Sequence, residues 1–256
     1  MCNKPVLICF AAFFWMLTSC AANLKETQKQ SASYRNLGEA YLAQGNVTAA
    51  LKEFLNAEKI YADDPFLQND LGLAYLAKNK PDTAMEYFQK AIQLKPDYAP
   101  AMNNLGTVYM NLKDYDKAIS CFEAITNDLL YATPHYPLTN LGICYYHKQN
   151  YDRSESYFQK ALKILPGFPI ALKGLAKTHM AQGKLASAIS FLEDAVKNAP
   201  QAADIWYDLG SAYLENRQPD KAIGAFQKVV ALAPSSDLAR EAEIKIRSIK
   251  KRDKAP

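Results

Sequence analysis

The sequence predicts an all-α protein, an α-solenoid of six helix-turn-helix repeats followed by a C-terminal capping helix. Two observations support this fold class. Leucine recurs at intervals of 34, 34, 36, 34 and 34 residues between Leu37 and Leu209. Each interval also carries two sets of apolar residues spaced three, four and seven apart, the spacing of one helix face, with polar turn residues between them. A period of this length is typical of proteins whose repeats stack on their neighbours.

The first helix predicted in each repeat has three recurring positions: a leucine, a small residue directly after it, and an aromatic residue three positions further on. The leucines are Leu37, Leu71, Leu105, Leu141, Leu175 and Leu209. The small residues are Gly38, Gly72, Gly106, Gly142, Ala176 and Gly210. The aromatic position holds Tyr41, Tyr75, Tyr109, Tyr145, His179 and Tyr213. Because glycine and alanine lack a bulky side chain, we expect the two helices of a repeat to approach closely here.

The second helix predicted in each repeat has a small residue, a large residue four positions later and another apolar residue three positions beyond that. The large residues are Phe54, Phe88, Phe122, Phe158, Leu192 and Phe226. Since proline cannot continue a helix, four prolines mark the ends of repeats; they are Pro96, Pro166, Pro200 and Pro234. The predicted repeats are residues 31–64, 65–98, 99–134, 135–168, 169–202 and 203–236.

These recurring positions resemble the tetratricopeptide repeat, and the resemblance covers residues 31–236. It implies a right-handed superhelix with a groove lined by the first helix of each repeat. The last repeat needs a cover for its apolar face, and residues 237–256 are predicted to provide it as a capping helix with a basic tail. Its apolar positions are Leu238, Ala242, Ile246 and Ile249. Its basic outer residues are Arg240, Lys245, Arg247 and Lys250, interpreted as solvated.

The first nineteen residues are predicted to be a signal peptide. One positive charge, Lys4, precedes an unbroken apolar run of twelve residues, Val6 to Leu17. A membrane-spanning helix needs about 20 such residues, so this run fits the hydrophobic region of a secretory signal better than a membrane span. Small residues follow the run, as signal cleavage requires. A plain secretory signal and an uncleaved anchor remain open as alternatives.

The run Leu17-Thr18-Ser19-Cys20 resembles a bacterial lipobox. The resemblance implies cleavage before Cys20, a diacylglycerol on its thiol and a fatty acyl chain such as palmitate on its new amine. Residue 21 is Ala rather than Asp, which in a Gram-negative host points to the outer membrane, with the protein facing the periplasm. Residues 20–30 are then predicted to form the lipidated cysteine and a flexible tether.

Composition and motifs indicate no enzyme. Without residues 1–19 the chain keeps 29 basic and 26 acidic side chains, a balance that favours no nucleic-acid partner. No phosphate-binding loop, HExxH motif or serine elbow is present. We therefore expect no catalytic residues, no metal and no cofactor. The scattered His135, His147 and His179 are interpreted as structural. Cys121 and Cys144 are expected as two separate thiols, although a single disulfide is possible in an exported protein.

Binding of a protein partner is the expected alternative to catalysis. The second, fifth, ninth and twelfth positions of each repeat are expected to face the groove. The candidate peptide-binding residues are Phe66, Asn69, Leu73, Leu76, Asn103, Thr107, Met110, Thr139, Ile143 and Tyr146. Apolar patches with polar rims are typical of interaction sites, although some of these residues could instead pack at seams between repeats. Only Lys173 and Lys177 add positive charge, which disfavours a ligand bound by a terminal carboxylate.

One interval is 36 residues long, and the two additional residues fall between Cys121 and Gly142, where Pro134 and Pro137 bracket a turn. Six repeats with this "LYATPHYPLTNLG" junction are similar to the PilF/PilW family of type IV pilus biogenesis and stability proteins. That resemblance implies an outer-membrane lipoprotein, a pilotin or assembly factor, whose partner is a secretin subunit or another pilus assembly protein. The alternatives are a periplasmic scaffold for another envelope complex, such as cytochrome maturation or exopolysaccharide export, and a regulator of a peptidoglycan enzyme.

Overall fold

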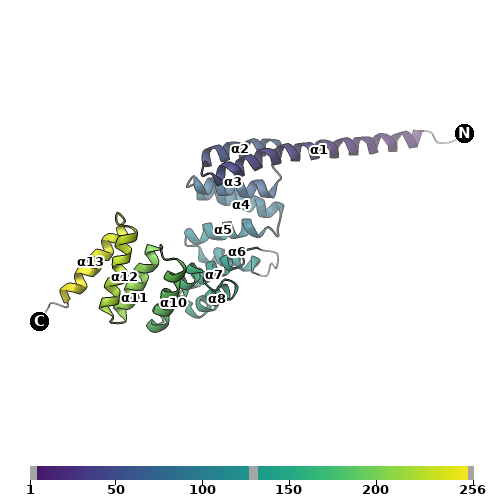
Figure 1. The fold of residues 1–256 in the computed structure, drawn as a ribbon. Coiled ribbons are helices and arrows are strands. Elements are labelled where there is room, and N and C mark those ends of the chain that lie inside the picture. The colour runs from purple at the N-terminus through teal and green to yellow at the C-terminus, as the bar shows by residue number, and fades with distance from the viewer. Residues whose placement is uncertain (1–4, 127–131, 253–256) are drawn as a thin grey trace. The chain divides into compact units, whose positions relative to one another are not determined.

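The computed structural model describes the backbone of residues 5–126 and 132–252 and the side chains of residues 23–126 and 132–251. These ranges contain thirteen α-helices and no strand, which confirms the all-α prediction. Most consecutive helices form hairpins, visible as adjacent pairs of coils in Figure 1. The chain divides into two compact parts, an N-terminal part (residues 1–108) and a C-terminal part (residues 109–256), which are described separately.

The N-terminal part contains two helical hairpins and most of a fifth helix. Its helices are α1 (Pro5–Ala43), α2 (Val47–Ile60), α3 (Pro65–Ala77), α4 (Pro81–Leu94) and α5 (Ala99–Asn111), the last of which ends beyond this part. Local chemistry sets the helix starts. The Asn46 side chain accepts a hydrogen bond from the backbone N–H of Ala49, and Asp64 accepts one from Phe66. Such caps satisfy donors that the first turn of a helix leaves without partners.

Helix α1 differs from the expected flexible tether. It is continuous over 39 residues and extends well past α2 (Figure 1). Residues 20–30 therefore lie inside a helix. The physical reason is composition, because the run "CAANLKETQKQ" contains good helix formers and neither glycine nor proline. The side chain of Cys20 and those of the predicted signal peptide lie outside the described residues, so its cleavage and acylation stay predictions.

Glycine and phenylalanine pack closely in both hairpins of the N-terminal part. A β-carbon at Gly38 would lie 2.5 Å from the ring of Phe54, and one at Gly72 would lie 2.5 Å from Phe88. Both phenylalanines are fully buried. The first repeat differs from the second in one respect, since Leu37 is 45% exposed whereas the equivalent Leu71 is fully buried. Among the described residues, no other helix covers this face of α1 at Leu37.

The C-terminal part contains one helix that completes the third repeat, three further hairpins and the final helix. Its helices are α6 (Tyr115–Ile125), α7 (His135–His147), α8 (Tyr151–Ile164), α9 (Pro169–Ala181), α10 (Leu185–Asn198), α11 (Ala203–Glu215), α12 (Pro219–Leu232) and α13 (Asp237–Arg252). One helical hairpin or helix pair lies within each predicted repeat from the second to the sixth. Leu130 and Tyr131 of the predicted junction lie outside the described residues.

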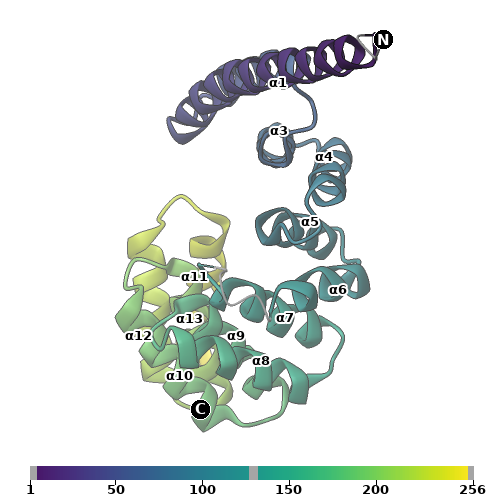
Figure 2. The ribbon, with the colours of Figure 1, turned by 90° about the vertical axis from the view of Figure 1, so that its right-hand side faces the viewer.

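Helix α13 covers the last repeat. It lies against α12 and α11, at the yellow end of the chain in Figures 1 and 2. Ala242 and Ile249 are buried in the core that these helices share with α9 and α10, and Leu238 and Ile246 pack against it. The Ser236 hydroxyl accepts a hydrogen bond from the backbone N–H of Ala239 and so caps the helix start. A single hairpin cannot bury its own apolar face, and α13 supplies the missing neighbour.

The turn between the two helices of every repeat contains one residue with a left-handed backbone, with φ between 56° and 75°. The six residues are Gly45, Asn79, Lys113, Gln149, Gly183 and Arg217. They repeat with the same spacing as the leucines. Glycine adopts this conformation freely, whereas other residues do so at a steric cost. Four of the six turns therefore hold a residue less suited to the conformation than glycine.

The aromatic position of the first helix contacts a glutamate of the preceding repeat. The Tyr145 hydroxyl donates a hydrogen bond to Glu123 at 3.0 Å, and Tyr213 donates one to Glu193 at 2.6 Å. In the fifth repeat the equivalent His179 is buried, with Nε2 3.3 Å from Glu155. His179 thus takes the structural place of a tyrosine.

The other histidines also pack on aromatic rings. His135 lies edge-on to Phe168, and His147 is stacked on Tyr115. Cys121 and Cys144 are both free thiols. Burial raises the pKa of Cys121 to about 11 and that of Cys144 to about 12. Both thiols are therefore protonated at neutral pH, the unreactive form of cysteine.

Candidate functional site

In the N-terminal part, the predicted groove residue most open to solvent is Phe66, which is 42% exposed. Its ring lies edge-on to Tyr98 with centroids 5.1 Å apart, and the Arg35 and Lys95 cations lie over it. Leu73 and Leu76 on the same helix are half-buried. This surface combines an aromatic pair with two cations, a suitable contact for an aromatic or anionic group.

The predicted asparagines are less accessible than expected. Asn69 is 5% exposed and accepts a hydrogen bond from Asn104 at 2.9 Å. Its amide oxygen is therefore already engaged across the seam between two repeats. Asn103 is half-buried, and its side-chain oxygen has no hydrogen-bond partner among the described residues. Thr107 donates its hydroxyl hydrogen bond to the Asn103 carbonyl, which fixes the Thr107 side chain on its own helix.

A charged cluster lies beside Asn69. The Arg35 guanidinium is 2.6 Å from Asp64, 3.2 Å from Glu39 and 4.0 Å from Asp70. Burial, with the negative charge of Glu39 nearby, raises the pKa of Asp70 to about 7. A carboxyl group of this kind holds its proton in mildly acidic solution, unlike an exposed aspartate.

In the C-terminal part, the predicted groove residues Met110, Thr139, Ile143 and Tyr146 have different environments. Thr139 is 2% exposed and donates a hydrogen bond to the His135 carbonyl at 2.7 Å, so it is not part of the accessible surface. Met110 is half-buried against the core of α6 and α7. Ile143 and Tyr146 are also half-buried, and both line a pocket.

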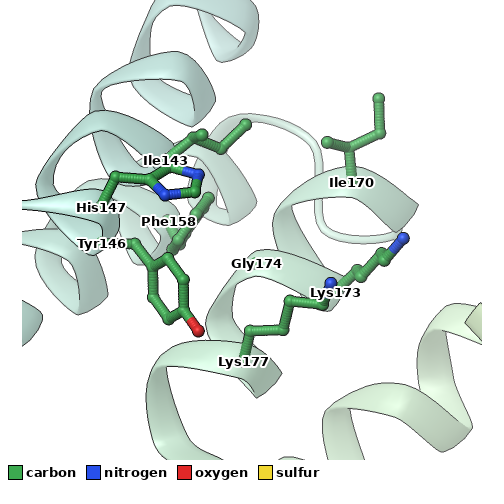
Figure 3. Close-up of a pocket in the computed structure, with 8 residues that line it drawn as sticks. All are labelled: Ile143, Tyr146, His147, Phe158, Ile170, Lys173, Gly174 and Lys177. Atoms are coloured by element: carbon green, nitrogen blue, oxygen red, sulfur yellow. The ribbon is translucent and has the colours of Figure 1, made fainter. Parts of the chain in front are cut away.

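This pocket, named here the α7–α9 pocket, has a volume of about 290 Å³ and lies between α7, α8 and α9. Figure 3 shows Ile143, Tyr146 and His147 of α7 facing α9. The lining residues are Ile143, Tyr146, His147, Phe158, Ile170, Lys173, Gly174 and Lys177. Its walls are mainly apolar, and the two lysines form its polar edge. Burial raises the pKa of Tyr146, which keeps its hydroxyl protonated.

One cross-repeat contact is missing at the pocket. At three other seams, the side chain at the fifth position of a repeat contacts a side chain 35 residues later. The observed contacts are Arg35 with Asp70, Asn69 with Asn104, and Lys173 with Asp208. The corresponding pair in the fourth and fifth repeats is Thr139 and Gly174. Glycine offers no side chain there, and a β-carbon would lie 2.3 Å from the Phe158 ring.

Two lysines one helical turn apart provide the charge of the pocket. Lys173 and Lys177 lie 3.5 and 3.3 Å from the same Asp208 carboxylate, and Lys173 also pairs with Asp204. Partial burial opposes ionisation of Asp204, but the hydrogen bond and positive charge of Lys173, together with backbone hydrogen bonds, outweigh it and lower the pKa of Asp204. Both aspartates stand outside the lining, so every charged side chain that lines the pocket is basic.

His147, Phe158 and Gly174 were not among the predicted site residues. One signal in the sequence could have identified them. The position directly before the recurring leucine holds Asn or Asp in five repeats and Gly174 in the fifth repeat alone. A departure from the repeat at a seam between first helices indicates a place where the surface is hollow.

Within residues 23–126 and 132–251, no group of three or more His, Cys, Asp or Glu side chains is arranged to hold a metal ion. In the part of the chain that the structure describes, no helix has the length and apolar character needed to span a membrane.

Comparison with known proteins supports the repeat fold. Tetratricopeptide repeat family models match residues 21–65, 65–98, 97–166, 132–201 and 173–237, so that together they cover residues 21–237. No curated protein matches the sequence.

Solved structures are similar in fold and distant in sequence. PilW, described as a widely conserved type IV pilus biogenesis factor, is 23% identical with a TM-score of 0.77, over 82% of this chain and 97% of PilW. PilF of Pseudomonas aeruginosa is 20% identical with a TM-score of 0.74, over 86% of this chain and 99% of PilF. YrrB, described as having an unusual peptide-binding site, is 21% identical with a TM-score of 0.55, over 75% and 97%.

The predicted likeness to PilF and PilW is thus found at the level of the fold. The stacked hairpins, the contact between small residue and phenylalanine and the family matches agree with one another. The chain belongs to the tetratricopeptide repeat family, whose members are scaffolds that bind protein partners.

Proposed function

We propose that this protein is a lipid-anchored assembly factor, a pilotin, for the secretin of a type IV pilus. It would lie at the outer membrane, face the periplasm, bind a secretin subunit or another pilus assembly protein, and have no catalytic activity. The observation that carries the proposal is the likeness of fold to PilW and PilF, which extends over 97% and 99% of those chains. A likeness over nearly the whole of both pilus proteins favours a shared role more than a match to a few repeats would.

The N-terminal sequence supports the anchor. The lipobox-like Leu17-Thr18-Ser19-Cys20 would place the acyl chains directly before the polar residues of α1. Each buried methylene contributes about 0.8 kcal/mol, so two or three chains would hold the protein permanently at a bilayer. Placement at the membrane brings the repeats to the compartment where a secretin assembles.

The test is to delete the gene and measure secretin multimers in membrane fractions. We expect monomers to accumulate in the deletion strain and multimers to return with the wild-type gene. Cys20→Ser should remove the acyl chains, as measured by mass spectrometry of the mature protein, and should reduce multimers. Cys121→Ser is the matched control, because it alters a half-buried thiol and leaves the lipobox intact. Normal multimers in the deletion strain would refute the proposal.

A further inference from the structure

We propose that the α7–α9 pocket binds an extended segment of a protein partner that inserts one apolar side chain and places an aspartate or glutamate against Lys177. This inference builds on the proposed function, since it requires that the repeats bind protein. It goes beyond that function by specifying the chemistry of the bound segment. Three features of the pocket carry it: its size, its apolar walls and the charge of its edge.

The size of the pocket suits a side chain. Its volume of about 290 Å³ lies at the lower limit of the roughly 300–1,000 Å³ typical of small-molecule sites. The ring of Phe158 forms part of the wall and is itself 1% exposed, so it belongs to the fixed core. Ile170 is 50% exposed at the mouth. A leucine or phenylalanine entering beside Ile170 would bury apolar surface that is now in contact with water.

The seam between the fourth and fifth repeats lacks a polar contact that three other seams have. At those seams, a side chain of the next repeat pairs with the side chain at the fifth position. Here the Thr139 hydroxyl donates its hydrogen bond to a carbonyl of its own helix, and Gly174 has no side chain that could contact it. The ring of Phe158 lies where a side chain at position 174 would be and forms a wall of the pocket, so an inserted side chain would pack on this ring.

The charge at the edge selects an acidic neighbour. Lys173 is 23% exposed and has two carboxylate partners, Asp204 and Asp208. Lys177 is 42% exposed and shares only Asp208. Among the described side chains, Lys177 therefore has one carboxylate partner, which it shares, whereas Lys173 has two. A carboxylate on the partner, reaching the exposed side of Lys177, would give this lysine an anion of its own. Such complementarity contributes chiefly to specificity.

The experiment selects random peptides, displayed on phage, against the full chain purified in detergent. Enriched peptides are then synthesised with a fluorescent label and titrated by anisotropy. We expect them to share an apolar residue close to an aspartate or glutamate. Ile170→Ala and Lys177→Glu should each weaken binding about fivefold or more, as expected for contacts at the centre of an interface.

Matched controls separate pocket contacts from general effects. Ile164→Ala removes an isoleucine of similar exposure on α8, and Lys228→Glu reverses an exposed lysine on α12, both outside the pocket. These variants should bind like the wild type. A peptide whose acidic residue is replaced by lysine should bind poorly to the wild type and regain affinity for Lys177→Glu. This rescue would show that the variant is folded and that the two charges meet.

Three outcomes would overturn the inference. They are enriched peptides without an acidic residue, unchanged binding by Ile170→Ala and Lys177→Glu, and self-association of the chain that occupies the pocket and depends on Ile170. The peptide assay needs no pilus. If secretin multimers persist in the deletion strain while the peptide selectivity holds, the proposed function fails and the pocket chemistry stands. If multimers are lost and the peptides show no selectivity, the proposed function stands and the pocket chemistry fails.

Discussion

Phe88 packs so closely on the backbone of Gly72 that a β-carbon at Gly72 would lie 2.5 Å from the ring atom Cε1. The ring is fully buried and belongs to the core of the hairpin, so it has little room to move. Gly72→Ala should therefore destabilise the N-terminal part by about 1–3 kcal/mol, the usual cost of overpacking a core. Chemical denaturation followed by circular dichroism measures the effect.

Gly224→Ala is the control for this prediction. Gly224 also lies within a helix, α12, but a β-carbon there has no neighbour within 4 Å. Alanine favours the helical backbone, so this variant should be more stable by about 0.5–1 kcal/mol. Equal effects of the two substitutions would show that the close contact at Gly72 does not exist in solution.

Asp70 predicts a pH dependence. Burial, together with the nearby charge of Glu39, raises its folded pKa to about 7, whereas an unfolded aspartate titrates near 3.9. Between these values the folded chain holds a proton that the unfolded chain releases. Asp70 therefore destabilises the fold increasingly as the pH rises from about 4 to 7, and the full cost is present above 7.

Asp70→Asn replaces the carboxylate with a neutral group of the same shape, the residue that Asn104 provides in the next repeat. The variant should be more stable than the wild type at about pH 8, by about 1 kcal/mol or more, and should lose this advantage at about pH 5. Urea denaturation at both pH values measures the difference. Asp82→Asn, at an exposed position on α4, should have the same effect at each pH. If Asp70→Asn changed the free energy of unfolding equally at both pH values, the raised pKa of Asp70 would be contradicted.

The capping helix α13 offers two isoleucines in contrasting environments. Ile249 is 3% exposed in the shared core, and Ile244 is 58% exposed. Ile249→Ala should cost about 2–5 kcal/mol, as for other isoleucine truncations in cores, and Ile244→Ala should change stability by less than about 0.5 kcal/mol. Thermal melts of the two variants provide the comparison, and similar melting temperatures would mean that α13 does not cover the last repeat.

Leu73 tests the groove of the N-terminal part. It is half-buried on α3 at a position expected to face the groove. Leu73→Glu should abolish capture of the partner in a pull-down with the secretin while helicity stays unchanged, because a charge would replace an apolar contact. Leu94→Glu is the control, since Leu94 is 37% exposed at the end of α4. Undiminished capture by Leu73→Glu would exclude this surface from the interface.

The helices could be predicted because the repeat supplies six copies of one pattern. A single "NLGTVYM" is ambiguous, but six leucines followed by small and aromatic residues determine which face of each helix is buried. The first repeat follows the pattern in sequence but not in burial. Leu37 carries the repeat leucine and is nevertheless exposed, because burial of this leucine depends on a neighbouring helix and the described residues place none over it.

The candidate site was less predictable, because it depends on departures from the pattern. Position alone suggested that Asn69 and Thr139 face the groove, but both are buried and hydrogen-bonded. The pocket depends on Gly174, where a side chain is absent, and on Phe158, which the pattern assigned to the core. Side-chain hydrogen bonds across a seam cannot be read from the sequence of one repeat. The expected tether was helical for a related reason, as polarity does not by itself prevent helix formation.

The left-handed turn residues have a consequence for how the protein can vary. Lys113, Gln149 and Arg217 each occupy a conformation that glycine adopts with less steric cost. Single substitutions at these corners would adjust the stability of one hairpin at a time, without altering any residue that lines the α7–α9 pocket. The stability of a single hairpin could thus be raised or lowered by substitution while the residues that recognise a partner stay the same.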